Sequence, residues 1–361
     1  MKTLITGAAG FIGARVAHLL LERGEEVVGL DNLNDYYDPQ LKYARLAPLA
    51  LDPRFRFIAA DIADRNSMEE IFLRERFDKV IHLAAQAGVR HSIDQPHVYV
   101  ATNVTGFLHI LEGVRGTDVR QMIYASSSSV YGTSRQLPFA IDDRADTPVS
   151  LYAATKRANE LMAHCYHHLF QIPATGLRFF TVYGPWGRPD MAPFRFAQAI
   201  VRGETIDVYN YGRMQRDFTY IDDIAEGVVR VAEREPQGYR LFNVGASQPV
   251  GLLDFIGTLE RALGRRAKKR FLPLQPGDVV ATHADVEDFW QFTGFRPTTT
   301  IETGLGKFAQ WYLDYYGEGQ RDEHEGDRNT AGARNLERPA IGREHSAGHG
   351  GSSAEAVSQT S

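Results

Sequence analysis

The chain has 361 residues, of which 43% are hydrophobic and 24% are charged, and its formal net charge is -5. These values predict a soluble globular protein with one large or two modest domains. The acidic balance argues against a nucleic-acid partner, because phosphate binding requires a basic surface. The amino terminus lacks a signal-peptide pattern and no apolar stretch reaches roughly eighteen residues, so we expect a cytoplasmic protein with no membrane partner.

Short apolar runs alternate with helical patterns through the first half of the chain. The runs that indicate strands are residues 4–5, 27–30, 55–60, 80–83, 122–125 and 174–179. Between the first two, Phe11 to Glu22 carries apolar side chains near helical spacing, and Gly24 is suited to end that helix. The alternation predicts an α/β fold, with a Rossmann-type doubly wound parallel sheet that has helices on both faces.

A glycine-rich loop, Gly7-Ala8-Ala9-Gly10-Phe11-Ile12-Gly13, joins the first predicted strand to the first predicted helix. Glycines in this position allow a tight turn, close approach of backbone amides to a pyrophosphate, and close packing of the helix on the strand. The loop therefore predicts a dinucleotide site, with contacts from Gly7, Gly10, Phe11, Ile12 and Gly13.

Acidic and small residues follow the next three strands. Asp31 ends the second strand, where a carboxylate accepts from both ribose hydroxyls and repels a 2′-phosphate, so with Asn32 beside it NAD is favoured over NADP. Asp61 and Ile62 end the third strand and either meet the adenine or cap the following helix. After the fourth strand, small residues leave room for the cofactor over the sheet edge, and the contacts predicted there are Leu83, Ala84, Ala85 and Ala87.

Tyr152 and Lys156 are spaced to lie on one face of a helix, about 25 residues after the serine run 126–129. A nearby ammonium favours the phenolate of a tyrosine whose usual pKa is about 10, which makes Tyr152 a usable general base. The alternative is a chance surface pair, but the glycine loop and the serine run favour catalysis. Farther along the same helix, Cys165 is interpreted as a small buried hydrophobe.

The sequence changes character near residue 185. We expect residues 1–185 to form an NAD-binding domain, joined by return segments from about 218–250, and residues 186–317 to form mainly a smaller substrate lobe. From 318 to 361 the only residue among Phe, Trp, Tyr, Leu and Met is Leu336. Such a segment buries too little apolar surface to offset its ordering entropy, so we predict a disordered tail.

With these features in this order, residues 1–317 resemble the extended short-chain dehydrogenase/reductase family that acts on nucleotide sugars. Within that family the chain is most similar to the UDP-glucuronate 4-epimerases, and the similar stretches are residues 31–39, 84–90, 187–192 and 216–223. The resemblance implies tightly bound NAD, a UDP-sugar substrate, and a homodimer formed through two helices of each subunit.

The resemblance also implies roles for the catalytic residues. Tyr152 removes the proton of the sugar 4-hydroxyl while C4 passes hydride to the nicotinamide, Lys156 holds the nicotinamide ribose, and Ser127 hydrogen-bonds the same hydroxyl. The 4-keto sugar then turns over and takes the hydride back on its other face. Thr102 and Phe180 are implied as further cofactor contacts.

On the nucleotide side, the resemblance implies that Arg216 binds the diphosphate and that Val208 and Tyr209 line the uracil. Asp278 belongs to a second nucleotide-side loop. In that loop Gln275 stands where UDP-galactose epimerases place an arginine, which leaves a second phosphate clamp open.

The sugar side departs from the family's dehydratases and decarboxylases, which carry an acid where this chain has Ser128 and Ser129. Without that acid, dehydration and decarboxylation are disfavoured. A 4-keto glucuronate is a β-keto acid and loses carbon dioxide when its C5–C6 bond aligns with the ketone. Hydroxyls suited to holding the carboxylate out of that alignment are Ser127, Ser128, Ser129 and Thr181, although Thr181 is also explained by ordinary packing at a strand end.

Arg90 and Arg188 are further candidates for the sugar carboxylate or the phosphates. We therefore predict an isomerase without a metal that interconverts UDP-glucuronate and UDP-galacturonate. The alternatives are a 4-epimerase of UDP-glucose or UDP-N-acetylglucosamine, a UDP-glucuronate decarboxylase, and a non-catalytic NAD-binding protein on the same fold.

Overall fold

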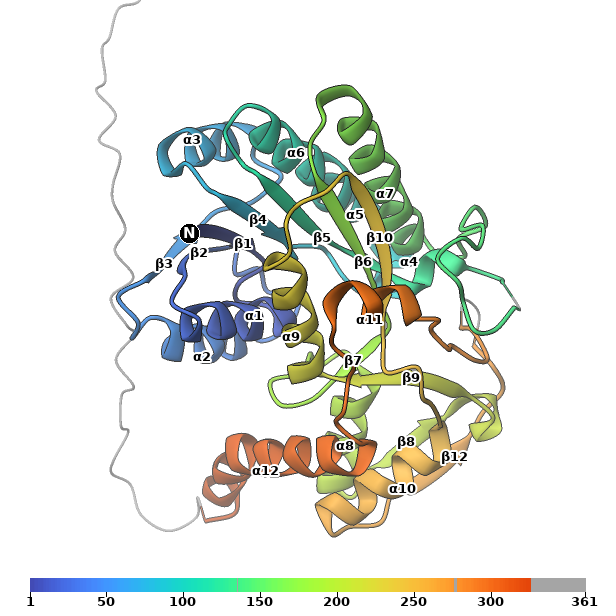
Figure 1. Ribbon diagram of the computed structural model, residues 1–361. Helices are drawn as coiled ribbons and strands as arrows, with labels where there is room; N and C mark the ends of the chain where they lie inside the picture. Colours follow the sequence, from blue (N-terminus) through green and yellow to red (C-terminus); the bar gives the residue numbers. More distant parts are fainter. Residues whose placement is uncertain (135, 276–277, 326–361) are drawn as a thin grey trace, which may run out of the picture. The chain divides into compact units, whose positions relative to one another are not determined.

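A parallel sheet forms the centre of the computed structural model, which describes residues 1–134, 136–275 and 278–325 and in them a sheet of seven strands (Figure 1). The strand order is β10-β6-β5-β4-β1-β2-β3, and every neighbouring pair is parallel. Each run predicted as a strand lies in this sheet, so the predicted fold class is confirmed. The strands are β1 (Lys2–Thr6), β2 (Glu26–Asp31), β3 (Phe55–Ala59), β4 (Lys79–His82), β5 (Gln121–Ser127), β6 (Ala174–Phe179) and β10 (Tyr239–Val244).

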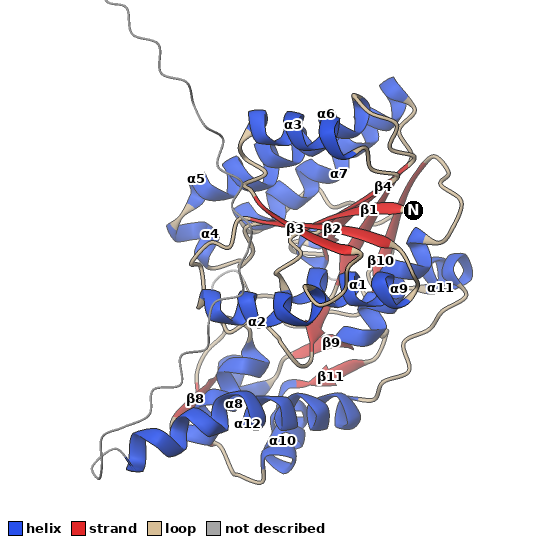
Figure 2. Ribbon diagram, turned by 90° about the vertical axis from the view of Figure 1, so that its left-hand side faces the viewer, coloured by secondary structure: helices blue, strands red, loops and turns tan. Residues whose placement is uncertain are grey.

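Both faces of this sheet are covered by helices, as Figures 1 and 2 show. Successive strand residues point to opposite faces, so Leu4 packs in the cluster under α3, α6 and α7, and Ile5 packs in the cluster under α1 and α9. Both residues are fully buried, and because both faces of the sheet are covered in this way, its strands appear in the sequence as continuous apolar runs. The flanking helices are α1 (Phe11–Glu22), α2 (Pro39–Leu49) and α9 (Ile221–Ala232) on one face, and α3 (Arg65–Glu75), α6 (Phe107–Arg115) and α7 (Leu151–Phe170) on the other.

The smaller lobe lies below the carboxyl edge of the large sheet in Figure 1. Its three-stranded sheet has the order β11-β9-β7, and β8 pairs in parallel with β12. Helix α9 and strand β10 carry the chain back to the large sheet, where β10 pairs with β6. The lobe's elements are β7 (Thr181–Tyr183), α8 (Ala192–Arg202), β8 (Thr205–Val208), β9 (Gln215–Tyr220), β11 (Pro249–Gly251), α10 (Leu252–Leu263), β12 (Lys268–Phe271) and α12 (Ile301–Glu325), whereas α11 (Glu287–Thr293) packs against α9 and β10.

Short helical segments lie in the loops that join these elements. They are α4 (His91–Asp94), α5 (Pro96–Tyr99), η1 (Val100–Gly106), η2 (Ser128–Tyr131) and η3 (Tyr209–Gly212). Segment η1 is a π-helix, a form that is often found at functional sites.

Helix α12 runs to Glu325, past residue 318 at which the predicted tail begins. Residues 318–325 are rich in charged helix formers, which allow a helix to continue without an apolar face. The rest of the predicted tail, 326–361, lies outside the described residues. Within the part of the chain that the structure describes, no helix is both long and apolar enough to cross a membrane.

The interpretation of Cys165 as a buried residue is wrong. The inward face of α7 carries Ala153, Lys156, Glu160 and Ala163, at helical spacing. Position 165 is two residues beyond the last of these, which turns its side chain away from the sheet, and Cys165 is exposed.

Candidate active site

The glycine loop is packed too tightly to accept side chains. Gly7 has φ of +74°, and a Cβ there would lie 2.7 Å from the backbone nitrogen of Ala84. A Cβ on Gly13 would lie 2.1 Å from the carbonyl oxygen of Gly7, so helix and strand approach each other as predicted. Since the first amides of a helix have no partner inside it, the N–H groups of Phe11 and Ile12 offer donors to an anion. This backbone cradle fits the pyrophosphate of a dinucleotide.

Asp31 lies beside the cradle with its side chain almost buried. Its Oδ2 accepts from the amide of Ala9 at 3.2 Å and its Oδ1 from the amide of Leu33 at 2.9 Å. The ammonium of Lys42 is 3.8 Å from Oδ1. These contacts fix the carboxylate and leave lone pairs free, which fits a ribose acceptor.

Asn32 and Asp61, predicted from neighbouring strand ends, contact each other. The amide of Asn32 donates to Asp61 Oδ2 at 3.0 Å. Asp61 does not cap the next helix, because Asp64 accepts from the first amides of α3. The side chain of Ile62 is buried in the core, so only its backbone is available to a cofactor.

The segment after β4, residues 83–87, is tied to its neighbours by backbone contacts. The hydroxyl of Thr6 accepts from the amide of Ala84 at 3.2 Å. Asn103, in the π-helix next to Thr102, holds both the amide and the carbonyl of Gln86, at 2.8 and 3.0 Å. Asn103 was not predicted from the sequence, although it directly follows Thr102, which was predicted to contact the cofactor.

Tyr152 lies in the first turn of α7, whose start is fixed by the side chain of Ser150 accepting from the amide of Ala153 at 3.1 Å. Burial raises the pKa of Tyr152, while the positive charge of Arg188 and a hydrogen bond with Ser127 lower it. Ser127 and Arg188, which come from two other elements, therefore both act on the phenol of Tyr152.

Lys156 is anchored to the central sheet. Its ammonium donates to the carbonyl of Ala125 on β5 at 2.9 Å. Burial lowers the pKa of Lys156 to about 8. The role predicted for Lys156, which is to favour the phenolate of Tyr152 and hold the nicotinamide ribose, stays a prediction.

The serine run turns from β5 into the short helix η2. Ser127 caps that helix, and its Oγ accepts from the amide of Ser129 at 3.2 Å. The hydroxyls of Ser127 and Ser129 are 3.1 Å apart. Ser128 begins the helix between them, so the three predicted hydroxyls lie on one turn next to Tyr152.

A buried ionic cluster that the sequence analysis missed lies behind these residues. Glu160, four residues after Lys156, accepts from Arg178 at 2.8 and 2.9 Å and from the hydroxyl of Ser126 at 2.5 Å. Arg157 adds a further bond at 2.7 Å. Burial raises the pKa of Glu160, but these donors outweigh it and hold the pKa below its usual value. The cluster joins α7, β5 and β6 directly behind the serine run.

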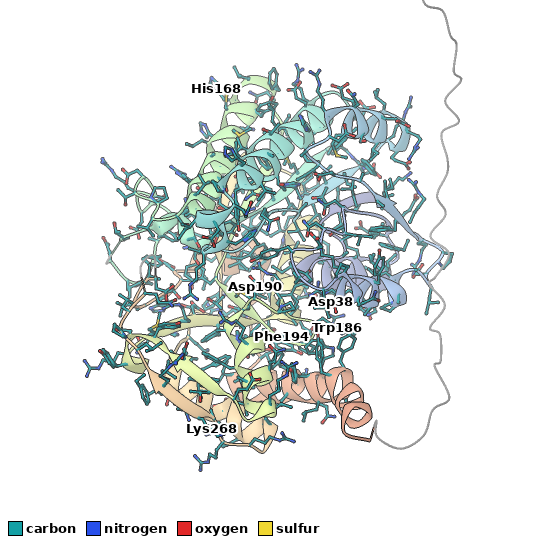
Figure 3. The ribbon with its side chains drawn as sticks, turned by 180° about the vertical axis from the view of Figure 1, so that it is seen from behind. Asp38, His168, Trp186, Asp190, Phe194 and Lys268 are labelled. Carbon is teal, nitrogen blue, oxygen red and sulfur yellow. The ribbon has the colours of Figure 1, made fainter. Side chains whose placement is uncertain are left out.

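On the sugar side, Arg188 is paired with an acid from its own loop. Arg188 Nε donates to Asp190 Oδ1 at 2.9 Å, a second bond joins Nη2 to Oδ2, and the hydroxyl of Tyr36 donates to Oδ2 at 3.2 Å. Burial and the charge of Asp190 raise the pKa of Tyr36 to about 12. Figure 3 shows Asp190 at the level where the large sheet meets the smaller lobe. Asp190 and Tyr36 were not predicted from the sequence.

Three predicted substrate residues meet on the nucleotide side. Arg90 lies 3.3 Å from Asp278 and 5.5 Å from the centre of the Tyr209 ring. Arg216 donates to the carbonyls of Gln215 and Val280 at 2.9 and 3.2 Å, and burial lowers its pKa. Arg90 is half-exposed and Arg216 has only carbonyl acceptors, so both cations are suited to an anionic ligand.

The remaining predicted contacts lie deeper. Thr181 begins β7 and is half-buried, at the edge that carries the serine run. The ring of Phe180 packs against Tyr131 and Phe139 in a separate core cluster. Val208 is fully buried, so the side chain of the neighbouring Tyr209 is the one at the surface.

The glycine loop, Asp31, the serine run and the first turn of α7 gather at the carboxyl ends of the parallel strands, where ligands bind in sheets of this type. A dinucleotide cradle and a helix that carries Tyr152 and Lys156 at one edge are typical of a short-chain dehydrogenase/reductase. Comparison with known proteins is specific about the family. A model of the NAD dependent epimerase/dehydratase family matches residues 3–245, and the chain belongs to that family.

Curated and solved relatives cover most of the chain. An uncharacterized 37.6 kDa protein of Escherichia coli O111:H- is 54% identical over 88% of this chain and 99% of its own length. A probable UDP-glucuronate 4-epimerase of Rhizobium meliloti is 44% identical, covering 88% and 98%. The crystal structure of UDP-glucuronic acid 4-epimerase from Bacillus cereus, in complex with UDP-glucuronic acid and NAD, superposes with a TM-score of 0.83 at 35% identity, covering 88% and 100%.

Proposed function

We propose that the protein catalyses the reversible NAD-dependent 4-epimerisation of UDP-glucuronate to UDP-galacturonate. The observation that carries the proposal is the meeting of Tyr152, Ser127 and Arg188 at the same sheet edge as the glycine cradle. The activities named for the Rhizobium meliloti and Bacillus cereus relatives support it. NAD, when bound, accepts a hydride from the sugar and returns it, so the reaction has no net redox change.

In this proposal Tyr152 is the general base for the sugar 4-hydroxyl. Burial of its phenol raises the pKa, which keeps the group protonated until a positive charge or a hydrogen bond stabilises the phenolate. Arg188 and Ser127 act in that direction, but burial outweighs them in the protein without ligands, and the pKa of Tyr152 stays above its usual value. In our proposal Lys156, whose ammonium is buried beside the carbonyl of Ala125, holds the nicotinamide ribose.

The serine turn, with Thr181 at the same edge, binds the sugar carboxylate in our proposal. The hydroxyls of Ser127, Ser128 and Ser129 donate to a carboxylate without supplying an acid, which disfavours dehydration and loss of carbon dioxide. Arg188, whose charge lowers the pKa of Tyr152, is the second group we propose for the carboxylate.

We propose that the nucleotide is bound from the other side of the site. Arg216 is the diphosphate ligand, because arginine binds phosphate oxygens at two points and its present partners are only carbonyls. Tyr209, Arg90 and Asp278 surround the uridine end.

The proposed assembly is a cytoplasmic homodimer, with residues 1–185 as the NAD-binding domain and 186–317 mainly as the substrate lobe. Leucines on α6 and α7 support the dimer: Leu108, Leu161 and Leu169 are 37%, 57% and 60% exposed. Exposed apolar side chains on neighbouring helices are suited to a shared interface. Sedimentation of the purified protein tests this, since a monomer at micromolar concentration would contradict it.

The function is tested by incubating the purified protein with UDP-glucuronate and separating the products. We expect UDP-galacturonate, and equal final mixtures from either sugar. UDP-xylose with carbon dioxide would identify a decarboxylase instead. Faster turnover of UDP-glucose or UDP-N-acetylglucosamine would move the substrate to a neutral sugar. A Tyr152→Phe variant with unchanged behaviour would indicate a non-catalytic NAD-binding protein.

A further inference from the structure

Arg45, on α2, is a buried arginine whose five hydrogen bonds all go to uncharged acceptors. Its Nε and Nη2 donate to the carbonyl of Trp186 at 3.1 and 2.7 Å, and Nη2 reaches the carbonyl of Gly187 at 3.4 Å. Its Nη1 donates to the carbonyl of Ala9 at 3.0 Å and to the hydroxyl of Tyr37 at 2.6 Å. Only 4% of Arg45 is exposed.

These acceptors belong to two loops with different tasks. Ala9 is in the glycine loop, and its own amide donates to Asp31, the predicted ribose ligand. Trp186 and Gly187 directly precede Arg188, whose charge acts on Tyr152. One planar guanidinium therefore joins the cofactor cradle to the segment that carries the sugar-side cation.

The backbone at Trp186 is strained. Its φ is +64°, in the left-handed region that a bulky side chain rarely adopts. Two bonds from Arg45 hold the Trp186 carbonyl, and the indole packs against Trp311 and Tyr315, with ring centres 5.3 and 5.1 Å away. Figure 3 shows Trp186 beside Asp38, the residue that caps α2. Strain of this kind persists only where surrounding contacts determine the conformation.

The charge of Arg45 has no acidic partner among the described residues, in contrast to Arg178, which is paired with Glu160. Burying a cation without an anion costs stability, and an apolar side chain of similar size is often a cheaper way to fill such a space. The guanidinium at this position is therefore explained by the two loops whose carbonyl groups it binds. An anionic cofactor at the neighbouring glycine cradle would supply a negative charge close to it.

We propose that Arg45 is a positioning residue that couples NAD binding to the sugar side of the site. It holds the 186–188 segment against the glycine loop, so occupation of the cradle fixes Arg188 beside Tyr152. This inference rests on the proposed function for the identity of the sugar, but not for the coupling. Because binding free energies are reciprocal, NAD must tighten UDP-sugar binding by the same factor as the UDP-sugar tightens NAD binding.

The test uses full-length protein stripped of NAD in a Tyr152→Phe background, in which bound sugar does not react. Calorimetry measures NAD binding, and UDP-glucuronate binding with and without NAD, before and after Arg45→Met. We expect NAD affinity to fall about tenfold to a hundredfold, as for loss of charge-assisted hydrogen bonds. The tightening of UDP-glucuronate binding by NAD should fall to less than about threefold. Arg45→Lys keeps the charge but lacks the planar set of guanidinium donors, so its NAD affinity and its coupling should both be intermediate.

Arg54→Met is the matched control, since Arg54 lies just after α2, is largely exposed, and binds only Asp52 among the described side chains. It should change neither affinity. The proposal is overturned if Arg45→Met lowers the melting temperature but leaves NAD affinity and the coupling unchanged. Should Arg45→Met not fold, unchanged coupling in Arg45→Lys overturns it equally.

Failure of the proposed function gives a different result. If UDP-glucuronate does not bind even with Arg45 in place, the assigned sugar is wrong. The coupling is then measured with the neutral UDP-sugar that does bind, and the NAD arm of the experiment is unaffected.

Discussion

The two sides of the candidate site hold their charges in opposite ways. Behind the serine turn, Glu160 and Arg178 are almost fully buried and bound to each other through two hydrogen bonds. On the ligand side, Arg188 binds an acid of its own loop and Arg90 binds Asp278 at a half-exposed surface. The first pair has no access to a ligand, whereas the second group has partners that an anionic ligand is able to replace.

This difference follows the chemistry. Proton and hydride transfer require donor and acceptor to be fixed, and a buried cluster on two strands and a helix gives α7 a fixed position. A sugar that must turn over between two half-reactions requires contacts that break and re-form. Cations on loops, whose present partners a ligand is able to replace, fit that requirement.

The largest effect is expected from Tyr152→Phe, which removes the proposed base while keeping the ring. Turnover should fall roughly 10²- to 10⁴-fold, the range for loss of a general base. NAD should remain bound, because the cradle and Asp31 are untouched. Tyr166→Phe, on the same helix but bonded to Glu112 at 2.5 Å, is the control and should keep full activity. Turnover and NAD content are measured on the same samples.

Removing the carboxylate of the buried cluster should affect stability most. Glu160→Ala leaves Arg178 charged and unpaired in the core, which typically costs about 3–5 kcal/mol. The control is Glu69→Ala, because Glu69 makes an exposed pair with Arg65 that should be worth under about 1 kcal/mol. Urea unfolding compares the two, and an equal loss would show that the cluster does not anchor α7.

The contribution of Lys156 to the unfolding free energy of the NAD-free protein should depend on pH. Burial lowers its pKa to about 8, below its usual value near 10.5, so between these pH values the unfolded chain binds more protons than the native one. The unfolding free energy contributed by Lys156 therefore rises with pH from about 8 to 10.5, by roughly 3 kcal/mol in all, and below about pH 8, where both states are protonated, the contribution no longer changes with pH. The difference between wild type and Lys156→Met, measured by urea unfolding across this range, should show the rise. A flat difference would mean that the lysine is solvated.

Much of this site follows from local sequence. The glycine loop, the strand ends and the serine run are each set within a few residues, and parallel topology brings them to one edge. Glu160 was also within reach, since it continues the spacing of Tyr152 and Lys156 by one more helical turn. Its partner Arg178 is on β6. A contact between a helix and a strand depends on how the chain folds, so no residue spacing in the sequence indicates it.

The pairing of Tyr36 with Asp190 was beyond local patterns for the same reason, as was the bond from Arg45 to the loop at Trp186. Each joins segments more than a hundred residues apart. The contact of Lys156 with β5 was not predicted, because helical spacing gives the face of a residue but not where a long side chain ends. The strand that receives its ammonium is known only from the packed structure.

Arg216→Ala should weaken substrate binding without changing the chemical step. If Arg216 binds the diphosphate, loss of a charged hydrogen bond of about 1.5–3 kcal/mol raises KM roughly tenfold to a hundredfold, with kcat nearly unchanged. Arg213→Ala, three residues earlier and exposed, is the matched control. A fall in kcat with constant KM would place Arg216 with the chemistry and not with the nucleotide.

The smallest effect is expected at Arg90, and it tests whether the ligand side is built from exchangeable contacts. The side chain is 50% exposed and pairs with Asp278, so its present contact is worth under about 1 kcal/mol, and Arg90→Ala should barely change stability. If a ligand takes the guanidinium away from Asp278, Asp278→Asn should then lower KM slightly, by removing a competitor, while Arg90→Ala raises it severalfold. Steady-state kinetics at low and at 0.5 M salt separate the two, because screening weakens exposed pairs. If both variants raised KM equally, the pair would be a fixed structural unit, and the contrast with the buried cluster behind the serine turn would no longer hold.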